Sequence, residues 1–164
     1  MKTIYRIAIL IGIMLMIACA QAEKQPEEQS PAEGKASGDY TYTVLENGTA
    51  EITGYSGEDE NVVIPGTLDG YPVTAIGEQA FLNCSSLTSV TIPEGVTAIG
   101  NDAFFNCTGL TSIVIPDSVE RIGNSAFCDC TGLTSVIIPA GVKSLGEFVF
   151  YLPESVKLTM ADIH

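Results

Sequence analysis

Three cysteines recur at a fixed spacing and are the residues of this chain best placed to do chemistry. Cys84, Cys107 and Cys130 lie 23 residues apart. If a repeating fold stacked them at the spacing of neighbouring strands, about 4.8 Å, the thiols would be close enough for a disulfide. Zinc sites favour short Cys-x-x-Cys spacings, which the chain lacks, and buried thiols behave as small apolar side chains. We therefore interpret the column as structural, with a redox role for Cys128 and Cys130 as the alternative; the redox state of all four thiols is left open.

Other side-chain sets typical of enzymes are missing from the sequence. The one histidine, His164, is the last residue and would lie at a frayed end. The run Glu58-Asp59-Glu60 lacks the ligand spacing of a calcium loop, and no nucleotide-binding glycine motif or HExxH motif occurs. The net charge of −13 disfavours binding to a nucleic-acid backbone. We expect neither catalysis nor a cofactor nor a metal nor a nucleic-acid partner.

A repeat of 23 residues positions these side chains. Several columns keep this period, although the first gap between prolines, Pro65 to Pro93, is longer because of extra residues within 67–72. A unit of this length cannot close its own core, so the copies are expected to stack and share one. The repeating columns are Ile76, Ile99, Ile122 and Leu145; Gly77, Gly100, Gly123 and Gly146; and Phe81, Phe104, Phe127 and Phe150.

Each unit contains one alternating segment and one segment rich in small residues. In the run 87–93, Val90 and Ile92 face one way and Thr91 faces the other, which is a strand pattern. Equivalent strands one repeat apart must be parallel and in register. The segment Gly-x-x-Ala-Phe-x-x-Cys is expected to cross the opposite side as a short helical turn. The sequence therefore predicts an α/β-type right-handed solenoid over residues 62–152.

One complete unit resembles the BspA-like leucine-rich-repeat family. The matching residues are Leu87, Val90, Ile92, Pro93, Val96, Ile99, Gly100, Ala103, Phe104 and Cys107. The resemblance covers about residues 40–152. It implies that the parallel sheet lines the concave side, that the cysteines pack inward, and that residues 39–61 form an N-terminal β cap. We interpret that cap as a hairpin with a turn at Asn47-Gly48.

The N-terminal segment predicts export. Residues 1–18 combine Lys2 and Arg6 with an apolar run that is too short to cross a bilayer, which is typical of a signal peptide. The stretch from Met16 to Cys19 resembles the lipobox of bacterial lipoproteins, which implies lipid attachment at Cys19. Ordinary cleavage after Ala20, giving a secreted protein, is the alternative. Residues 19–38 lack aromatic and β-branched side chains and predict a disordered tether.

The last copy departs from the repeat. Val149 replaces alanine, Pro153 replaces cysteine and Val156 replaces leucine, so residues 153–164 are expected to be either a C-terminal cap or a truncated repeat. The stretch from Val156 to Met160 has the composition of a final strand.

The outward side of the strands is the predicted binding surface. Alternation along each strand places two columns there: Val63, Thr91, Val114 and Ile137, and beside them Asn61, Ser89, Ser112 and Ser135. Outward ladder positions favour β-branched residues in any case, so the apolar column has a purely structural alternative. The family resemblance implies a surface-exposed binding module for cell adhesion or protein–protein recognition, with a protein or cell-surface ligand. The lipobox-like sequence places it at the cell membrane or outer membrane, and we expect a monomer. A structural envelope protein that stacks through the solenoid end is the alternative function.

Overall fold

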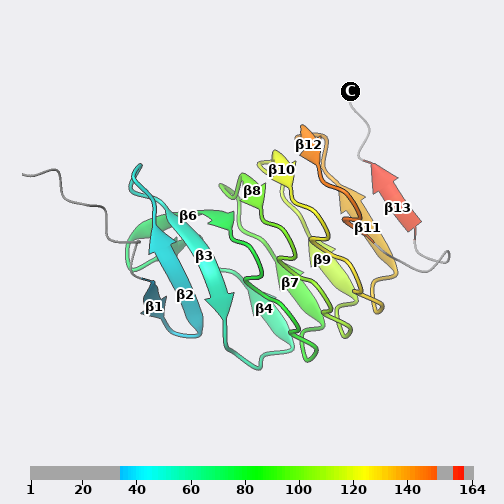
Figure 1. Cartoon of the computed structure of the whole chain (residues 1–164), viewed down its shortest axis with the longest axis horizontal. Helices are drawn as coiled ribbons and strands as arrows, with labels where there is room; N and C mark the ends of the chain where they lie inside the picture. Colours follow the sequence, from blue (N-terminus) through cyan, green and yellow to red (C-terminus); the bar gives the residue numbers. More distant parts are fainter. Residues whose placement is uncertain (1–33, 151–156, 161–164) are drawn as a thin grey trace, which may run out of the picture. The chain divides into compact units, whose positions relative to one another are not determined.

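The computed structural model describes residues 34–150 and 157–160 of the 164-residue chain. These residues belong to one compact unit, Ala32–His164, and form thirteen strands without a helix (Figure 1). The predicted signal peptide, Cys19 and most of the predicted tether lie outside the described residues. So does His164.

The first side of each coil contributes a strand to a sheet that we call sheet I. The strands are short, and equivalent residues pair in parallel, with Asn61 opposite Ser89 and Ser89 opposite Ser112. The predicted parallel, in-register sheet is therefore confirmed. β11 lies beside β9 in Figure 1 but starts a separate ladder. Sheet I comprises β4 (Asn61–Val63), β7 (Ser89–Thr91) and β9 (Ser112–Val114), followed by β11 (Ser135–Ile138) and β13 (Lys157–Met160).

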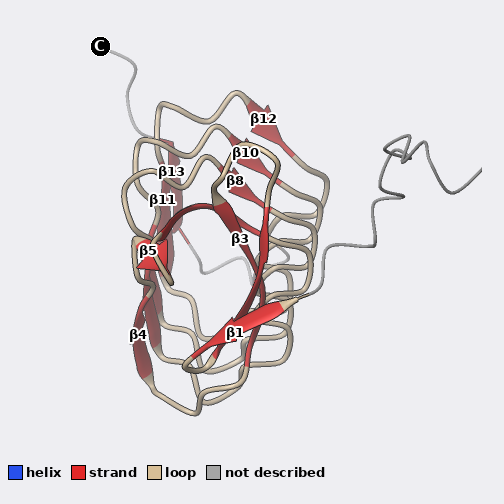
Figure 2. Ribbon diagram, turned by 90° about the vertical axis from the view of Figure 1, so that its left-hand side faces the viewer, coloured by secondary structure: helices blue, strands red, loops and turns tan. Residues whose placement is uncertain are grey.

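The second side of each coil contributes to sheet II, seen across the coil from sheet I in Figure 2. Its strands β3, β6, β8, β10 and β12 are parallel, whereas β1 and β2 extend the sheet in antiparallel pairing. The bounds are β1 (Lys35–Ser37), β2 (Tyr40–Val44), β3 (Ala50–Tyr55), β6 (Tyr71–Ile76), β8 (Ala98–Ile99), β10 (Arg121–Ile122) and β12 (Ser144–Leu145), with β5 (Thr67–Leu68) paired to β6.

A stack of aromatic rings fills the core between the two sheets. The repeated phenylalanines lie one above the next, with 4.8 Å between the ring centroids of Phe81 and Phe104 and 5.3 Å between those of Phe104 and Phe127. The stack continues to Tyr55 at one end and to Phe150 at the other. Because Phe81, Phe104 and Phe127 are completely buried, each coil depends on its neighbours for burial of its largest side chain.

The predicted helical turns are not confirmed, because the structure describes turns and no helix on this side of the coil. Within 77–84 and its copies, every second backbone N–H group donates to the next coil: that of Phe81 donates to the carbonyl of Ala103 at 2.7 Å, and that of Phe104 to the carbonyl of Ala126 at 2.8 Å. The N–H groups between them close short local turns, as that of Leu82 does with the carbonyl of Gln79 at 3.1 Å. Positive φ angles at Gln79 and Asn83 break any helical run. These segments are therefore turns bonded to the next coil, and the described fold is all-β rather than α/β.

The first described strands tie the N-terminal end together. β2 and β3 are joined through Asn47 and Gly48, with Gly48 at φ +77°, and β3 continues sheet II through β6. β1 occupies residues predicted to belong to the tether, so that prediction is wrong for its last residues. The physical reason is pairing: β1 bonds to β2, and the Ser37 hydroxyl donates to Asp69 at 2.9 Å. Whether these strands act as a cap remains a prediction.

Asp69 also accepts a hydrogen bond of 2.7 Å from the hydroxyl of Tyr42. This bond, followed by burial, raises the pKa of Tyr42 to about 12, and the same bond lowers the pKa of Asp69 below its usual value. A single carboxylate therefore links β1, β2 and the turn before β6.

The C-terminal end confirms one further prediction. β13 forms a strand within the stretch predicted to be the last one, and it pairs with β11 so that Ile137 faces Thr159. Val149, which replaces the repeated alanine, is buried, and Phe150 keeps its place in the aromatic stack.

Candidate binding surface

An exposed apolar column runs along the outer side of sheet I. Successive residues of each strand alternate between core and solvent, so Val62, Val90, Ile113 and Val136 are buried. Their neighbours point outward: Val63 is 74% exposed, Val114 58% and Ile137 62%, and Thr91 is also exposed. We call this column, with its polar neighbours described next, the binding face. The structure brings all the predicted residues of this face onto one side of sheet I.

A polar column lies two residues before the apolar one in each strand. Asn61, Ser112 and Ser135 are exposed and Ser89 is half-buried. The hydroxyl of Ser89 donates to the side-chain oxygen of Asn61 at 2.6 Å. Within the part of the chain that the structure describes, the hydroxyls of Ser112 and Ser135 make no side-chain hydrogen bond, so they remain available to a ligand.

Sequence reasoning missed one member of the binding face. Thr159 on β13 lies in register with Ile137 and is exposed. It extends the apolar column by one strand. The sequence predicts a final strand at 156–160. The register of that strand with β11, which the structure supplies, then places Thr159 at the outward position.

Acidic residues flank the binding face at both ends of its strands. Asp59 and Glu60 precede β4, whereas Glu94 and Asp117 follow β7 and β9; all four side chains are exposed. The face is thus an apolar strip with a negative border. Such a strip favours a ligand with apolar contacts at its centre and basic groups at its rim.

The cysteine column is built into the core rather than into a reactive site. Cys107 and Cys130 are fully buried, and their thiols donate to the carbonyls of Phe81 at 3.1 Å and Phe104 at 3.0 Å. The hydrogen bond with Cys130 and burial raise the pKa of Cys107 to about 12, and the pKa of the half-buried Cys84 is raised as well. Both thiols are therefore protonated at neutral pH and are poor nucleophiles.

No metal-binding cluster of His, Cys, Asp or Glu occurs among residues 34–150 and 157–160. Within the same ranges, no helix has the length and apolar composition needed to span a membrane. These two observations concern only the described residues.

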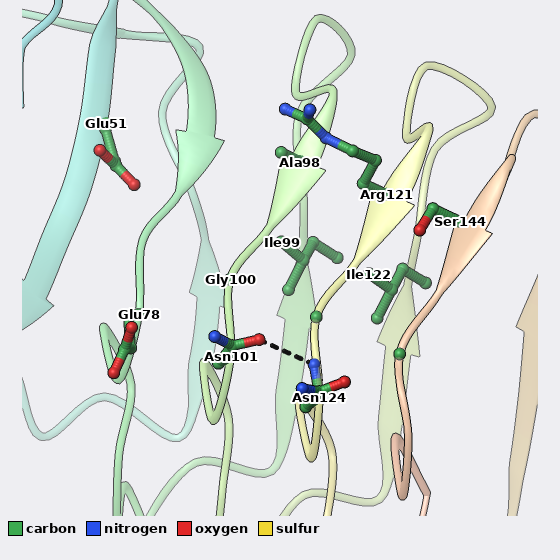
Figure 3. A pocket seen from close by; sticks show the side chains of 12 residues that line it. Glu51, Glu78, Ala98, Ile99, Gly100, Asn101, Arg121, Ile122, Asn124 and Ser144 are labelled. Carbon is green, nitrogen blue, oxygen red and sulfur yellow. Dashed lines mark hydrogen bonds between the residues drawn. The ribbon is translucent and has the colours of Figure 1, made fainter.

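A groove of about 410 Å³ lies on the outer side of sheet II, and the sequence did not predict it (Figure 3). Its lining includes the column of Gly100, Gly123 and Gly146, and Arg121 stands at the outward position that Ala98 and Ser144 occupy in the coils on either side. The glycines have a structural cause: a Cβ on Gly123 would lie 2.6 Å from the backbone of the preceding coil. Close stacking of coils therefore explains the glycines in the lining.

The in-register coils, the buried ladder of repeated side chains and the exposed strand face together define a leucine-rich-repeat type of β-solenoid. The family comparison agrees: residues 59–163 match the model described as BspA type leucine rich repeat region (6 copies). The chain belongs to this family. Among curated proteins, none matches the chain closely enough to count as a relative.

Solved structures of bacterial leucine-rich-repeat proteins share the fold. A leucine-rich repeat protein from Bacteroides capillosus is 30% identical, with a TM-score of 0.72 over 79% of this chain and 99% of that one. The leucine rich repeat protein of T. pallidum is 31% identical, with a TM-score of 0.67 over 77% of this chain and 64% of that one. A leucine rich cell surface protein from Faecalibacterium prausnitzii is 32% identical, with a TM-score of 0.62 over 80% of this chain and 43% of that one.

Proposed function

We propose that this protein is an exported, membrane-anchored recognition module that binds a protein ligand at the cell surface through the binding face. The observation that carries the proposal is the exposed apolar column, in which Val63, Val114 and Ile137 each keep more than half of their surface in solvent. Contiguous exposed apolar residues on a folded domain mark interaction sites more often than solitary ones do. The cell-surface description of the Faecalibacterium prausnitzii protein supports the location.

The ligand is expected to be apolar at its centre and basic at its edge. The binding face offers β-branched side chains and the hydroxyls of Ser112 and Ser135, and acidic residues lie at both ends of its strands. Equivalent strands in a sheet are spaced about 4.8 Å apart, so five strands give a face only about 20 Å wide. A contact of this size is smaller than the standard interface of about 800 Å² per partner, and many anchored copies would compensate by avidity.

The double substitution Val114→Glu plus Ile137→Glu tests this function. Two carboxylates in the centre of an apolar contact should reduce ligand capture at least about tenfold, because buried charges without partners are costly. Folding should be unaffected, since both side chains are largely exposed. The measurement is capture of extracellular matrix and cell-surface proteins by the immobilised protein, with far-UV circular dichroism to verify the fold. If all captured proteins bind the double variant and the parent equally, the binding face is not the site.

Membrane anchoring is proposed to occur through a lipid on Cys19. This residue lies outside the described structure, so the proposal depends on the lipobox-like sequence before it. Cys19→Ser should move the protein from the membrane fraction to the soluble fraction, because one short apolar segment without acyl chains is a weak anchor. Fractionation followed by immunodetection measures this, and an unchanged membrane-bound fraction would contradict the anchor.

A further inference from the structure

The groove of about 410 Å³ on the outer side of sheet II, which we call the sheet II groove, carries opposite charges at its two ends (Figure 3). Glu51 on β3 pairs with Ala75 on β6, and Ala98 on β8 pairs in turn with Ala75 and with Arg121 on β10. Glu51 and Arg121 therefore share one row across the sheet, three strand spacings or about 14 Å apart. Glu78 adds a second carboxylate on the side of Glu51.

The guanidinium of Arg121 is not used by the fold. It is exposed, and it forms no hydrogen bond or salt bridge within the part of the chain that the structure describes. The neighbouring Glu120 is bound by Lys143 at 2.6 Å, and this bond is the largest cause of the lowered pKa of Glu120, ahead of Arg121. In Figure 3 the side chain of Arg121 extends toward Ala98, whose small size leaves room for it. All five guanidinium donors are thus available to a ligand.

Two asparagine amides add further donors to the groove. The side-chain oxygen of Asn101 accepts the backbone N–H of Asn124 at 2.9 Å, and that of Asn124 accepts the N–H of Glu147 at 2.8 Å. These bonds orient both amides, because only the oxygen of an amide can accept. The Nδ2 groups form no hydrogen bond with any described residue. Two oriented N–H donors, one coil or about 4.8 Å apart, therefore remain for a ligand.

The acidic end of the groove is also without a partner of opposite charge. Glu51 is half-buried, and its Oε1 lies 3.1 Å from the point that a Cβ on Gly77 would occupy, so its carboxylate lies over the glycine of the first coil. Glu78 follows that glycine and is exposed. Neither carboxylate forms a salt bridge with a described residue. Opposite charges that the fold leaves unpaired favour a ligand that pairs with both.

We propose that the sheet II groove binds an extended peptide segment, which presents an acidic side chain to Arg121 and a basic side chain to Glu51 and Glu78. Carbonyl groups between the two charges accept hydrogen bonds from the Nδ2 groups of Asn101 and Asn124. An extended peptide rises about 3.4 Å per residue, so the acidic and basic residues of the ligand are four positions apart.

The charges of the groove select a ligand of this class. A polyanion is repelled by the acidic end, and a polycation is repelled by Arg121. The volume of about 410 Å³ is that of a site for a small ligand or a short segment, not for a folded domain. The groove lies across the coil from the binding face (Figure 2) and takes a different ligand, so a protein held by the binding face does not contact Arg121.

An NMR titration of the full ¹⁵N-labelled chain, in nonionic detergent at low ionic strength, tests the proposal. The probe is the peptide Lys-Ala-Ala-Ala-Glu, acetylated and amidated at its ends. We expect saturable shifts of the side-chain amide signals of Asn101 and Asn124, with a dissociation constant of about 1 mM. Arg121→Ala should raise this constant at least about threefold through loss of an ion pair. Lys35→Ala is the matched control, because it removes one exposed positive charge from β1, outside the groove.

A double-mutant cycle separates direct contact from a general effect of charge. Replacing the glutamate of the peptide by glutamine removes the same ion pair from the ligand, so Arg121→Ala should not weaken binding of that peptide further. Likewise, Glu51→Gln plus Glu78→Gln should weaken binding of the parent peptide but not of a peptide with norleucine in place of lysine. Backbone amide signals verify that each variant is folded, and Arg121→Ser, which installs the residue of the next coil, serves if Arg121→Ala fails this control.

Three results would overturn the peptide site. One is the absence of saturable shifts at Asn101 and Asn124 up to about 20 mM peptide. Another is an equal effect of Arg121→Ala and Lys35→Ala on the dissociation constant. The third is a cycle in which Arg121→Ala weakens both peptides by the same factor, because Arg121 would then not contact the acidic side chain.

Discussion

Phe104→Ala is expected to lower the free energy of unfolding by about 3–5 kcal/mol, the usual cost of replacing a buried phenylalanine by alanine. The ring of Phe104 is fully buried and stacks on Phe81 and Phe127, so its removal leaves a cavity between two coils. Domains of this size are stable by only about 5–15 kcal/mol, so one substitution in the middle of the stack removes a large share of the total.

Phe150→Ala is the matched comparison, because Phe150 is the last ring of the stack and is only partly buried. Its replacement should cost clearly less than that of Phe104. Urea unfolding followed by circular dichroism measures both, since the chain contains no tryptophan for fluorescence. Equal losses for the two variants would mean that the rings do not act as a stack shared between coils.

Gly123→Ala is expected to destabilise the protein by about 1–3 kcal/mol, near the upper end, through overpacking. A Cβ at this position would lie 2.6 Å from the backbone nitrogen of Asn101 and 2.6 Å from the carbonyl carbon of Gly100. Backbone cannot move aside as a flexible side chain can. The coils would have to separate, which weakens the 2.8 Å hydrogen bond from the N–H of Gly123 to the carbonyl of Ile99.

Gly66→Ala provides the control for the glycine column. A Cβ there meets nothing within 4 Å, and the φ angle of Gly66 is not positive. The substitution should leave stability unchanged or raise it slightly, because alanine restricts the unfolded chain. The same urea titration compares the two variants. If Gly123→Ala were as well tolerated as Gly66→Ala, close approach of coils would not explain the glycine column.

The 23-residue period predicts which residues are equivalent, and from this the core follows. Ile99, Phe104 and Cys107 are buried as their columns require, and Val114 points outward as alternation requires. The period does not reveal which carbonyl each N–H group meets. In the turn after Gly100 the acceptor lies in the next coil for every second N–H group, so the segment is not a continuous helix although its composition suits one.

Features that depend on a break in the repeat were harder to predict. β1 has a composition typical of disorder and is ordered by its pairing with β2 and by the contact of Ser37 with Asp69. Among the described residues, β12 is the last strand of sheet II and Leu145 on it is 46% exposed, which the columns alone do not show. The place of Arg121 in the lining of the sheet II groove becomes visible only once the coils on either side of it are known.

The most direct test of the central claim, recognition through the binding face, is to measure the dissociation constant of a captured ligand for three proteins. These are the parent, Val114→Glu plus Ile137→Glu, and Arg121→Glu. The last lowers the net charge by the same two units, because it removes one positive charge and adds one negative charge, but on the outer side of sheet II. We predict at least about tenfold weaker binding for the double variant and parent-like binding for Arg121→Glu. Parent-like binding by the double variant, or an equal loss in both variants, would contradict recognition through the binding face.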